Sequence, residues 1–264
     1  MKVCLLTSGS IGNAVVIEHE EGSILIDCGV SFKKFAELIG QTNLQMEKIE
    51  NVLVTHEHAD HIKGVGIISR KLGLQIWSTA KTSEALYEKG ILKETDQPVM
   101  TVEKYQSFHV SGFKVTPFPL SHDAADPVGY MVERDGKKVV CLTDTGYVSK
   151  EVMNTVKGAD VYIMELNHNV DLLLSSPKRP WPLKQRILSD DGHLSNEDGA
   201  YVFSKLLDAE KTRHVYLAHI SQEANTLEIA ASTMKSVLKD RRVDMSKLSI
   251  HMTYPLQPSH VVEI

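Results

Sequence analysis

Short apolar runs alternate with amphipathic stretches along most of the chain, which predicts a regular alternation of strands and helices. A continuous apolar run between turn residues is typical of a buried strand, and apolar residues at helical spacing indicate a helix with one buried face. The predicted strands are Val3 to Leu6, Ala14 to Glu18, Ser23 to Ile26, Ile49 to Val54, Gln75 to Ser78, Gln106 to Val110, Lys114 to Leu120, Val128 to Glu133, Lys138 to Leu142, Val161 to Met164, His214 to Leu217 and Leu248 to Met252. The predicted helices are Phe32 to Ile39, Gly64 to Leu72, Thr79 or Ala80 to Lys89, Lys150 to Lys157, Asn196 to Leu207 and Leu227 to Lys239. Strand-rich halves that alternate with amphipathic helices suggest two sheets with helices outside.

No linker or low-complexity tract divides these elements. We therefore expect one domain over residues 1–264, which is long enough to bury a sizeable core. One stretch departs from the pattern: Glu165 to Asp191 has little periodicity and much Pro, Ser, Lys and Arg. We predict a long irregular loop there, and such a loop inside a compact domain is usually functional or mobile.

The composition, with 42% hydrophobic and 24% charged residues, is that of a soluble globular protein. No apolar run approaches the ~18 residues of a membrane span, and the apolar part of the N-terminus is too short for a signal peptide. The cysteines Cys4, Cys28 and Cys141 lie beside strand-like runs, which suggests free thiols in the reducing cytoplasm. The net charge of -5 argues against a broad basic surface for nucleic acid, although two bound divalent ions would add about four positive charges locally.

The turn from His56 to His61 reads His-Glu-His-Ala-Asp-His and directly follows a predicted buried strand. Side chains alternate along an extended segment, so His56 and His58 point the same way, while Asp60 and His61 come after the chain turns. One turn can thus supply ligands to two metal ions. Imidazole and carboxylate suit zinc, manganese or iron. The alternative, exposed histidines with a solvated aspartate, fits a single histidine better than this whole set.

Four more residues of ligand type follow apolar runs, namely Asp27, His122, Asp144 and His219. Each one alone could be an ordinary turn or strand-end residue. Their shared placement at strand ends is what suggests a common site, because loops at strand ends usually carry the chemistry of a domain.

The order of Asp27, the His-x-His-x-Asp-His turn, His122, Asp144 and His219 resembles that of the metallo-β-lactamase superfamily. The resemblance covers nearly the whole chain and implies an αββα sandwich, in which two mixed β-sheets are flanked by helices. The stretches Thr7 to Asn13, Glu165 to His168 and Gly192 to Ser195 resemble in particular the WalJ/YycJ subgroup of DNA exonuclease-like proteins.

The resemblance implies two divalent metal ions at one sheet edge. It assigns one ion to His56, His58 and His122. It assigns the other to Asp60, His61 and His219, with Asp144 as the bridge. Asp27 would orient the ligand turn through hydrogen bonds. Antibiotic-hydrolysing relatives typically have a cysteine where Asp144 stands, and flavodiiron oxidases an acid where His58 stands, so neither activity is expected.

His193 lies in a motif that resembles one near the scissile phosphate in RNase Z-like and phosphodiesterase branches. The resemblance implies that His193 protonates the leaving oxygen or binds the phosphate, and that Asp60 can accept a proton from the attacking water. The alternative for His193 is an incidental residue in the helix-capping turn of Ser195. Glu165 would orient a histidine or pair with a cation. Further expected substrate contacts are Asn13, Ser195, Asn167 and His168.

The predicted loop also clusters four cations, Lys178, Arg179, Lys184 and Arg186, around Trp181 in an otherwise acidic chain. Phosphate contacts combined with base stacking are how single strands are held without sequence preference. The alternative is a solvated, proline-stiffened loop.

These features predict a metal-dependent phosphodiesterase that acts on nucleic acid, in particular a DNA exonuclease with 5′-3′ direction. The alternatives are a small-molecule (cyclic) phosphodiesterase, a thioester or lactone hydrolase, and, as a third class, a non-catalytic metal-binding regulator. The expected substrate is nucleic acid and no membrane association is expected; DNA against RNA, the native metal and the oligomeric state stay open.

Overall fold

The computed structural model describes residues 1–264, and within it the chain divides into two compact units. The first unit comprises Met1–Pro119, Ala124–Gly136 and Tyr254–Ile264, and the second comprises Leu120–Asp123 and Lys137–Thr253. The single domain expected from the sequence stays a prediction. None of the helices combines the length and the apolar composition that a bilayer crossing requires.

The first unit contains a mixed sheet of seven strands, followed in the chain by three antiparallel strands. The sheet consists of β1 (Lys2–Thr7), β2 (Ala14–His19), β3 (Gly22–Ile26), β4 (Ile49–Leu53), β5 (Gln75–Ser78), β6 (Met100–Thr101) and β14 (Val262–Glu263), in the order β14-β1-β2-β3-β4-β5-β6. Strands β14 to β3 pair antiparallel, and β3 to β6 pair parallel. The three further strands are β7 (Phe108–Val110), β8 (Phe113–Pro119) and β9 (Val128–Arg134). The very short strands β6 and β14 were not predicted, because so few residues cannot show the alternation that is typical of a strand.

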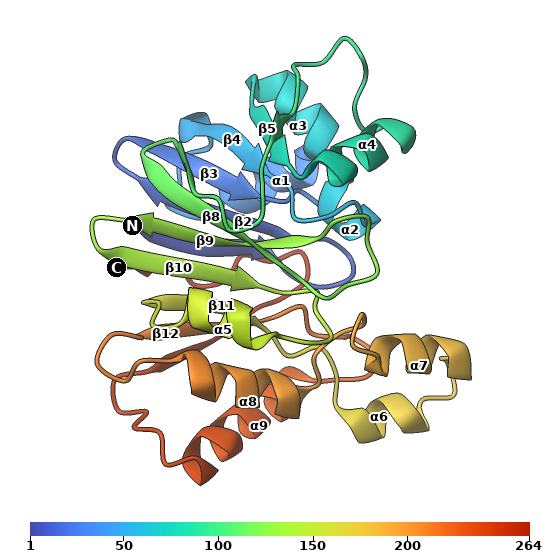
Figure 1. The fold of residues 1–264 in the computed structure, drawn as a ribbon, viewed down its shortest axis with the longest axis vertical. Helices are drawn as coiled ribbons and strands as arrows, with labels where there is room; N and C mark the ends of the chain where they lie inside the picture. Colours follow the sequence, from blue (N-terminus) through green and yellow to red (C-terminus); the bar gives the residue numbers. More distant parts are fainter. The chain divides into compact units, whose positions relative to one another are not determined.

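Helices cover the parallel part of this sheet (Figure 1). They are α1 (Phe32–Ile39), the 3-10 helix η1 (Met46–Lys48), α2 (Ala59–Ile62), α3 (Val65–Leu72) and α4 (Ala80–Glu88). The helix predicted from Phe32 has the predicted bounds, because the Oγ atom of Ser31 accepts a hydrogen bond from the Lys34 amide and fixes the start. Helix α1 contacts β1 and α3 contacts β4, and their apolar faces enclose a core around Phe35, Val52 and Ile68.

The second unit is built on four parallel strands, β10 (Lys137–Leu142), β11 (Val161–Glu165), β12 (His214–Ala218) and β13 (Ser249–Met252). Its helices are α5 (Lys150–Val156), α6 (Val170–Ser175), α7 (Trp181–Leu188), α8 (Asn196–Leu206) and α9 (Leu227–Asp240). Helices α8 and α9 lie side by side, with α8 against β11 and α9 against β13 (Figure 1). Parallel pairing brings the carboxyl ends of these strands to one edge of the sheet.

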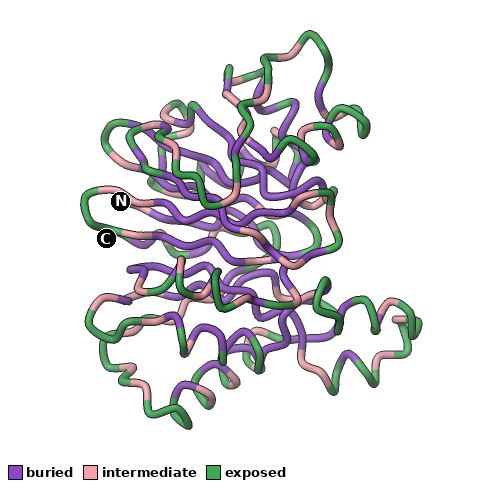
Figure 2. Tube along the Cα trace, in the orientation of Figure 1, coloured by how far each residue is buried: buried purple, intermediate pink, exposed green.

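The long irregular loop predicted from Glu165 to Asp191 is wrong in part, because α6 and α7 lie within it. The Asn169 side chain accepts a hydrogen bond from the Leu172 amide and starts α6, and a proline in the first turn favours the start of α7. Leu173 and Ile187 pack together in a small core of their own, while the rest of both helices is mostly exposed (Figure 2). Short helices with one or two buried residues show no apolar stripe, so the sequence pattern missed them.

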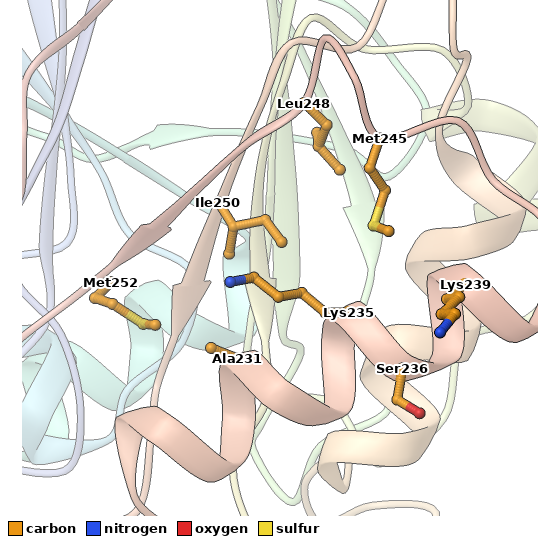
Figure 3. A pocket seen from close by; sticks show the side chains of 8 residues that line it. All are labelled: Ala231, Lys235, Ser236, Lys239, Met245, Leu248, Ile250 and Met252. Atoms are coloured by element: carbon orange, nitrogen blue, oxygen red, sulfur yellow. The ribbon is translucent and has the colours of Figure 1, made fainter.

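A groove of about 630 Å³ lies between α9 and β13, the end strand of its sheet (Figure 3). Lys235 and Lys239 line it from the helix, and Ile250 and Met252 from the strand. The helix thus leaves part of the apolar face of the end strand uncovered.

Candidate metal centre

Asp27 anchors the histidine turn of the first unit. It follows β3 and has a left-handed backbone with φ of 57°. Its Oδ1 atom accepts a hydrogen bond from the Thr55 amide at 2.8 Å, and its Oδ2 atom accepts one from the Thr55 hydroxyl at 2.7 Å. The Nδ1 atom of His61 lies 2.7 Å from the same Oδ2. A histidine whose Nδ1–H is held by a carboxylate presents the lone pair of Nε2 on the other side of the ring, which is how metal-ligating histidines are usually oriented.

His56 and His58 converge within this turn. The Nε2 atom of His56 lies 3.1 Å from the Nδ1 atom of His58, and the rings of His56 and His61 are 4.1 Å apart between centroids. Nitrogen atoms so placed can share one cation. The hydroxyl of Thr55 lies 2.9 Å from Nδ1 of His56. Thr55 was not singled out from the sequence; its position between the strand and the first histidine was the available signal.

The loop before β2 fixes the far end of the turn. The Asn13 amide donates to the Asp60 carbonyl oxygen at 2.8 Å, and its side-chain Nδ2 lies 3.2 Å from Asp60 Oδ2 and 3.0 Å from His61 Nε2. Gly29 passes so close that a Cβ atom there would lie 1.7 Å from the Asp60 carbonyl oxygen. Only glycine fits at position 29, and Asn13, an expected substrate contact, touches two expected metal ligands.

Three strand ends of the second unit bring carboxylates and imidazoles together. Asp144 follows β10 and His219 follows β12, and both have left-handed backbones, with φ of 59° and 53°. The Nδ1 atom of His219 lies 3.3 Å from Asp144 Oδ1 and 3.0 Å from Oε1 of Glu165, which ends β11. Residues other than glycine rarely adopt this conformation, and such strain concentrates at functional sites.

Glu165 is fully buried and accepts hydrogen bonds at both oxygens. Oε1 lies 2.8 Å from Nδ1 of His193, and Oε2 accepts from the amides of Thr145 at 3.0 Å and Leu194 at 3.3 Å. Burial raises the pKa of this carboxyl, but the charge of His193 and the hydrogen bonds from His193 and His219 outweigh it and lower the pKa. The carboxylate therefore stays charged and orients both rings.

His122 belongs to the same unit and is buried. Its Nδ1 atom lies 3.0 Å from the carbonyl oxygen of Gly192, and its ring centroid is 5.0 Å from that of His193. Gly192 is held tightly, because a Cβ atom there would lie 2.2 Å from the Arg186 carbonyl oxygen. His122 and His193 are thus fixed by the same short loop.

The donor chemistry of both units fits divalent metal ions. In the second unit one ligand atom each from Asp144, Glu165, His193 and His219 lies within 4.8 Å of the others. Both oxygens of Glu165 already accept hydrogen bonds. Asp144 and the imidazoles are therefore the better metal ligands. His61, His122 and His219 share one pattern: Nδ1 lies beside an oxygen acceptor. Mixed imidazole and carboxylate donors suit zinc, manganese and iron.

Three of the expected substrate contacts are buried, and the side chains of two of them, Asn167 and Ser195, support the backbone. The Asn167 side chain donates to the His219 carbonyl oxygen at 2.9 Å. The Ser195 hydroxyl caps α8 by accepting from the Asp198 amide at 3.0 Å. His168 is only 1% exposed, neither ring nitrogen makes a hydrogen bond, and burial lowers its pKa to about 4.

The cations expected to hold a strand are mostly engaged within the second unit. Arg179 pairs with Glu223 at 3.1 Å, and Arg186 pairs with Asp123. Lys178 is exposed, and Trp181, at the first position of α7, has 58% of its surface accessible. Lys178 and Trp181 are thus the exposed members of the predicted group that lie outside these ion pairs.

Histidines and carboxylates at the strand ends of both units define the class of metal-dependent hydrolases with a metallo-β-lactamase fold. The profile of the β-lactamase superfamily domain matches residues 23–220, and the chain belongs to this superfamily. The predicted family and the predicted αββα fold, two mixed β-sheets flanked by helices, are confirmed.

Relatives resemble the chain over nearly its whole length. It is 36% identical to an exodeoxyribonuclease YycJ of Bacillus anthracis, over 97% of both chains. It is 40% identical to an exodeoxyribonuclease WalJ of Streptococcus pneumoniae, over 90% of this chain and 88% of that protein. The crystal structure of the metallo-β-lactamase fold protein YhfI from Bacillus subtilis matches with a TM-score of 0.75 at 17% identity, covering 100% of this chain and 99% of that one.

Proposed function

We propose that this chain is a metal-dependent exodeoxyribonuclease that hydrolyses phosphodiester bonds from the 5′ end of DNA. The observation that carries the proposal is the identity of 36–40% with two exodeoxyribonucleases over nearly the whole chain. The histidines and carboxylates at the strand ends support it, because they supply the donors that a metal-dependent hydrolase needs.

The proposed ligands are those of the superfamily pattern. One ion would be held by His56, His58 and His122. The other would be held by Asp60, His61 and His219, with Asp144 shared. Bound ions lower the pKa of water from about 16 toward 7 and neutralise charge on a phosphoryl oxygen. Asp27 and Glu165 support the choice, because each holds a histidine Nδ1 by a buried carboxylate.

Two residues are proposed to move protons. Asp60 can accept a proton from the attacking water, and its Oδ2 atom is positioned by the Asn13 side chain at 3.2 Å. His193 can donate a proton to the leaving oxygen, because Glu165 holds its Nδ1 and thereby orients the ring. The His193 side chain is 20% exposed, which leaves it accessible to a phosphate.

Two further expectations, a single-stranded substrate and a cytoplasmic location, rest on other residues of the chain. Lys178 and Trp181 offer a charge and an aromatic surface to a single strand. The three cysteines are buried thiols, which supports the expected reducing cytoplasm.

The test uses metal-free protein reloaded with manganese or zinc. Linear single- and double-stranded DNA and RNA, labelled at the 5′ or the 3′ end, are compared with a circular single strand. We expect early release of the label from 5′-labelled linear DNA and no cleavage of the circle. A circle that is cut, or linear DNA that survives with every metal while a thioester or a cyclic phosphodiester is hydrolysed, would overturn the proposal.

Asp144→Asn and Asp160→Asn form a matched pair for this assay. Both carboxylates are buried in the second unit. Asp160 immediately precedes β11, so it lies at the end of the parallel strands away from Asp144 and Glu165, and it accepts a hydrogen bond from the Lys138 amide at 2.9 Å. Asp144→Asn should abolish nuclease activity, and Asp160→Asn should retain it. Equal activity in the two variants would remove Asp144 from the proposed site.

A further inference from the structure

Three buried asparagines, Asn167, Asn196 and Asn225, form one hydrogen-bonded network in the second unit. They are 7%, 0% and 6% exposed. The amides of Asn196 and Asn225 pair reciprocally: Asn196 Nδ2 donates to Asn225 Oδ1 at 2.9 Å, and Asn225 Nδ2 donates to Asn196 Oδ1 at 2.8 Å. Buried polar groups that are fully satisfied in this way rigidify the structure around them.

Asn225 connects the start of α9 to the chain that leaves β11. Its Nδ2 group lies 3.0 Å from the Leu166 carbonyl oxygen and 3.1 Å from that of Asn167, and its Oδ1 atom accepts from the Thr226 amide at 2.9 Å. Leu166 directly follows Glu165, so this contact fixes the segment that carries the buried carboxylate.

Asn167 connects the same segment to His219. Its side chain donates to the His219 carbonyl oxygen at 2.9 Å, and its own carbonyl oxygen accepts from the Ser221 amide at 2.8 Å. His219 needs such support, because its left-handed backbone, with φ of 53°, is unfavourable for a residue with a side chain.

Asn196 brings in the third segment, which carries His193. It is the first residue of α8, and its amide donates to the His168 carbonyl oxygen at 2.8 Å. The Asn167 amide donates to the Leu194 carbonyl oxygen at 3.0 Å. The chain segments of Glu165, His193 and His219 are therefore joined through these asparagines.

We propose that Asn167, Asn196 and Asn225 are positioning residues. Together they form an asparagine clamp that fixes the relative positions of Glu165, His193 and His219 for the proposed nuclease reaction. The inference rests on that proposed function for its effect on rate. Asparagine suits the task because its amide donates and accepts at once and stays neutral beside a cation site. An aspartate at position 225 would lose the donors and turn a carboxylate toward two carbonyl oxygens.

The test begins with metal-free protein, so that it does not depend on activity. Asn225→Leu is compared with Thr212→Val, a buried threonine at the other end of β12 whose hydroxyl donates to the Ala159 carbonyl oxygen at 2.7 Å. Hydrogen exchange of residues 166–169 and 219–224 is followed by mass spectrometry. We expect faster exchange in both segments for Asn225→Leu and not for Thr212→Val, because the clamp holds the backbone of both segments in place.

The second readout is nuclease activity at saturating metal. We expect kcat of Asn225→Leu to fall by about 10- to 100-fold, the usual effect of losing a residue that orients a ligand, with KM for DNA little changed. Thr212→Val should keep its kcat. Adding Asn196→Ala to Asn225→Leu should cost little more, because residues of one network are not additive.

Unchanged exchange in both segments, or a wild-type kcat in Asn225→Leu, would overturn the clamp. If Asn225→Leu does not fold, Asn167→Ala, which removes only the contact to His219, takes its place under the same criteria. A wild-type protein that degrades no DNA would instead refute the proposed function, and the exchange comparison would still decide whether the clamp exists.

Discussion

Replacing His168 by leucine should remove part of the pH dependence of folding. The ring is 1% exposed and makes no hydrogen bond, and burial lowers its pKa from the ordinary 6.5 to about 4. Between these pH values the unfolded chain protonates this histidine and the folded chain does not. Stability that is fully present above pH 6.5 is therefore lost as the pH falls toward 4.

The size of the effect follows from the two pKa values. The difference between 6.5 and about 4 corresponds to roughly 3 kcal/mol of unfolding free energy at the acidic end. Other titrating groups contribute in the wild type and in His168→Leu alike, so the comparison of the two proteins isolates this histidine. We expect the stability of the wild type, measured relative to His168→Leu, to fall by about this amount between pH 7 and 4.5.

The assay is urea unfolding of metal-free protein at a series of pH values, with the free energy extrapolated to water. Metal is left out because protonation of the ligands would release it and add a second pH dependence. His109→Leu is the control, since His109 is exposed in the folded protein and meets water in both states. Profiles of wild type and His168→Leu that stay parallel across this range would refute the reasoning.

The remaining predictions concern the proposed metal site and substrate. His58→Ala and Asp144→Ala should each lower the bound metal, because each loses a direct ligand; full occupancy by elemental analysis would contradict the assignment. His193→Ala should keep both metals and lower kcat on DNA by about 10² to 10⁴, with a smaller loss on a nitrophenyl phosphodiester whose leaving group needs little protonation; equal losses would indicate phosphate binding instead. Lys178→Ala should weaken DNA binding and flatten its salt dependence, whereas an unchanged salt slope would exclude a phosphate contact. Cys28 should resist thiol reagents in the folded protein at pH 8, because burial raises its pKa to about 12; rapid labelling of this cysteine would contradict its burial.

The sequence alone determined the features that are local in the chain. The histidine turn was recognisable because its ligands are contiguous and follow an apolar strand. Helix starts were predictable where one side chain caps its own helix, as Ser31 and Ser195 do. The order of the ligand residues was enough to indicate the superfamily, since that order does not depend on how the chain folds.

Only the tertiary structure decided how those residues are held. The left-handed backbones of Asp27, Asp144 and His219 could not be predicted from the sequence, because aspartate and histidine adopt this conformation at only a small minority of positions. Glu165 acquires its role from His219, 54 positions away in the sequence. Arg186 looked available for substrate, but a partner 63 positions away engages it. Such roles depend on contacts that form when distant strand ends meet at one edge of a sheet, and no periodicity along the chain encodes them.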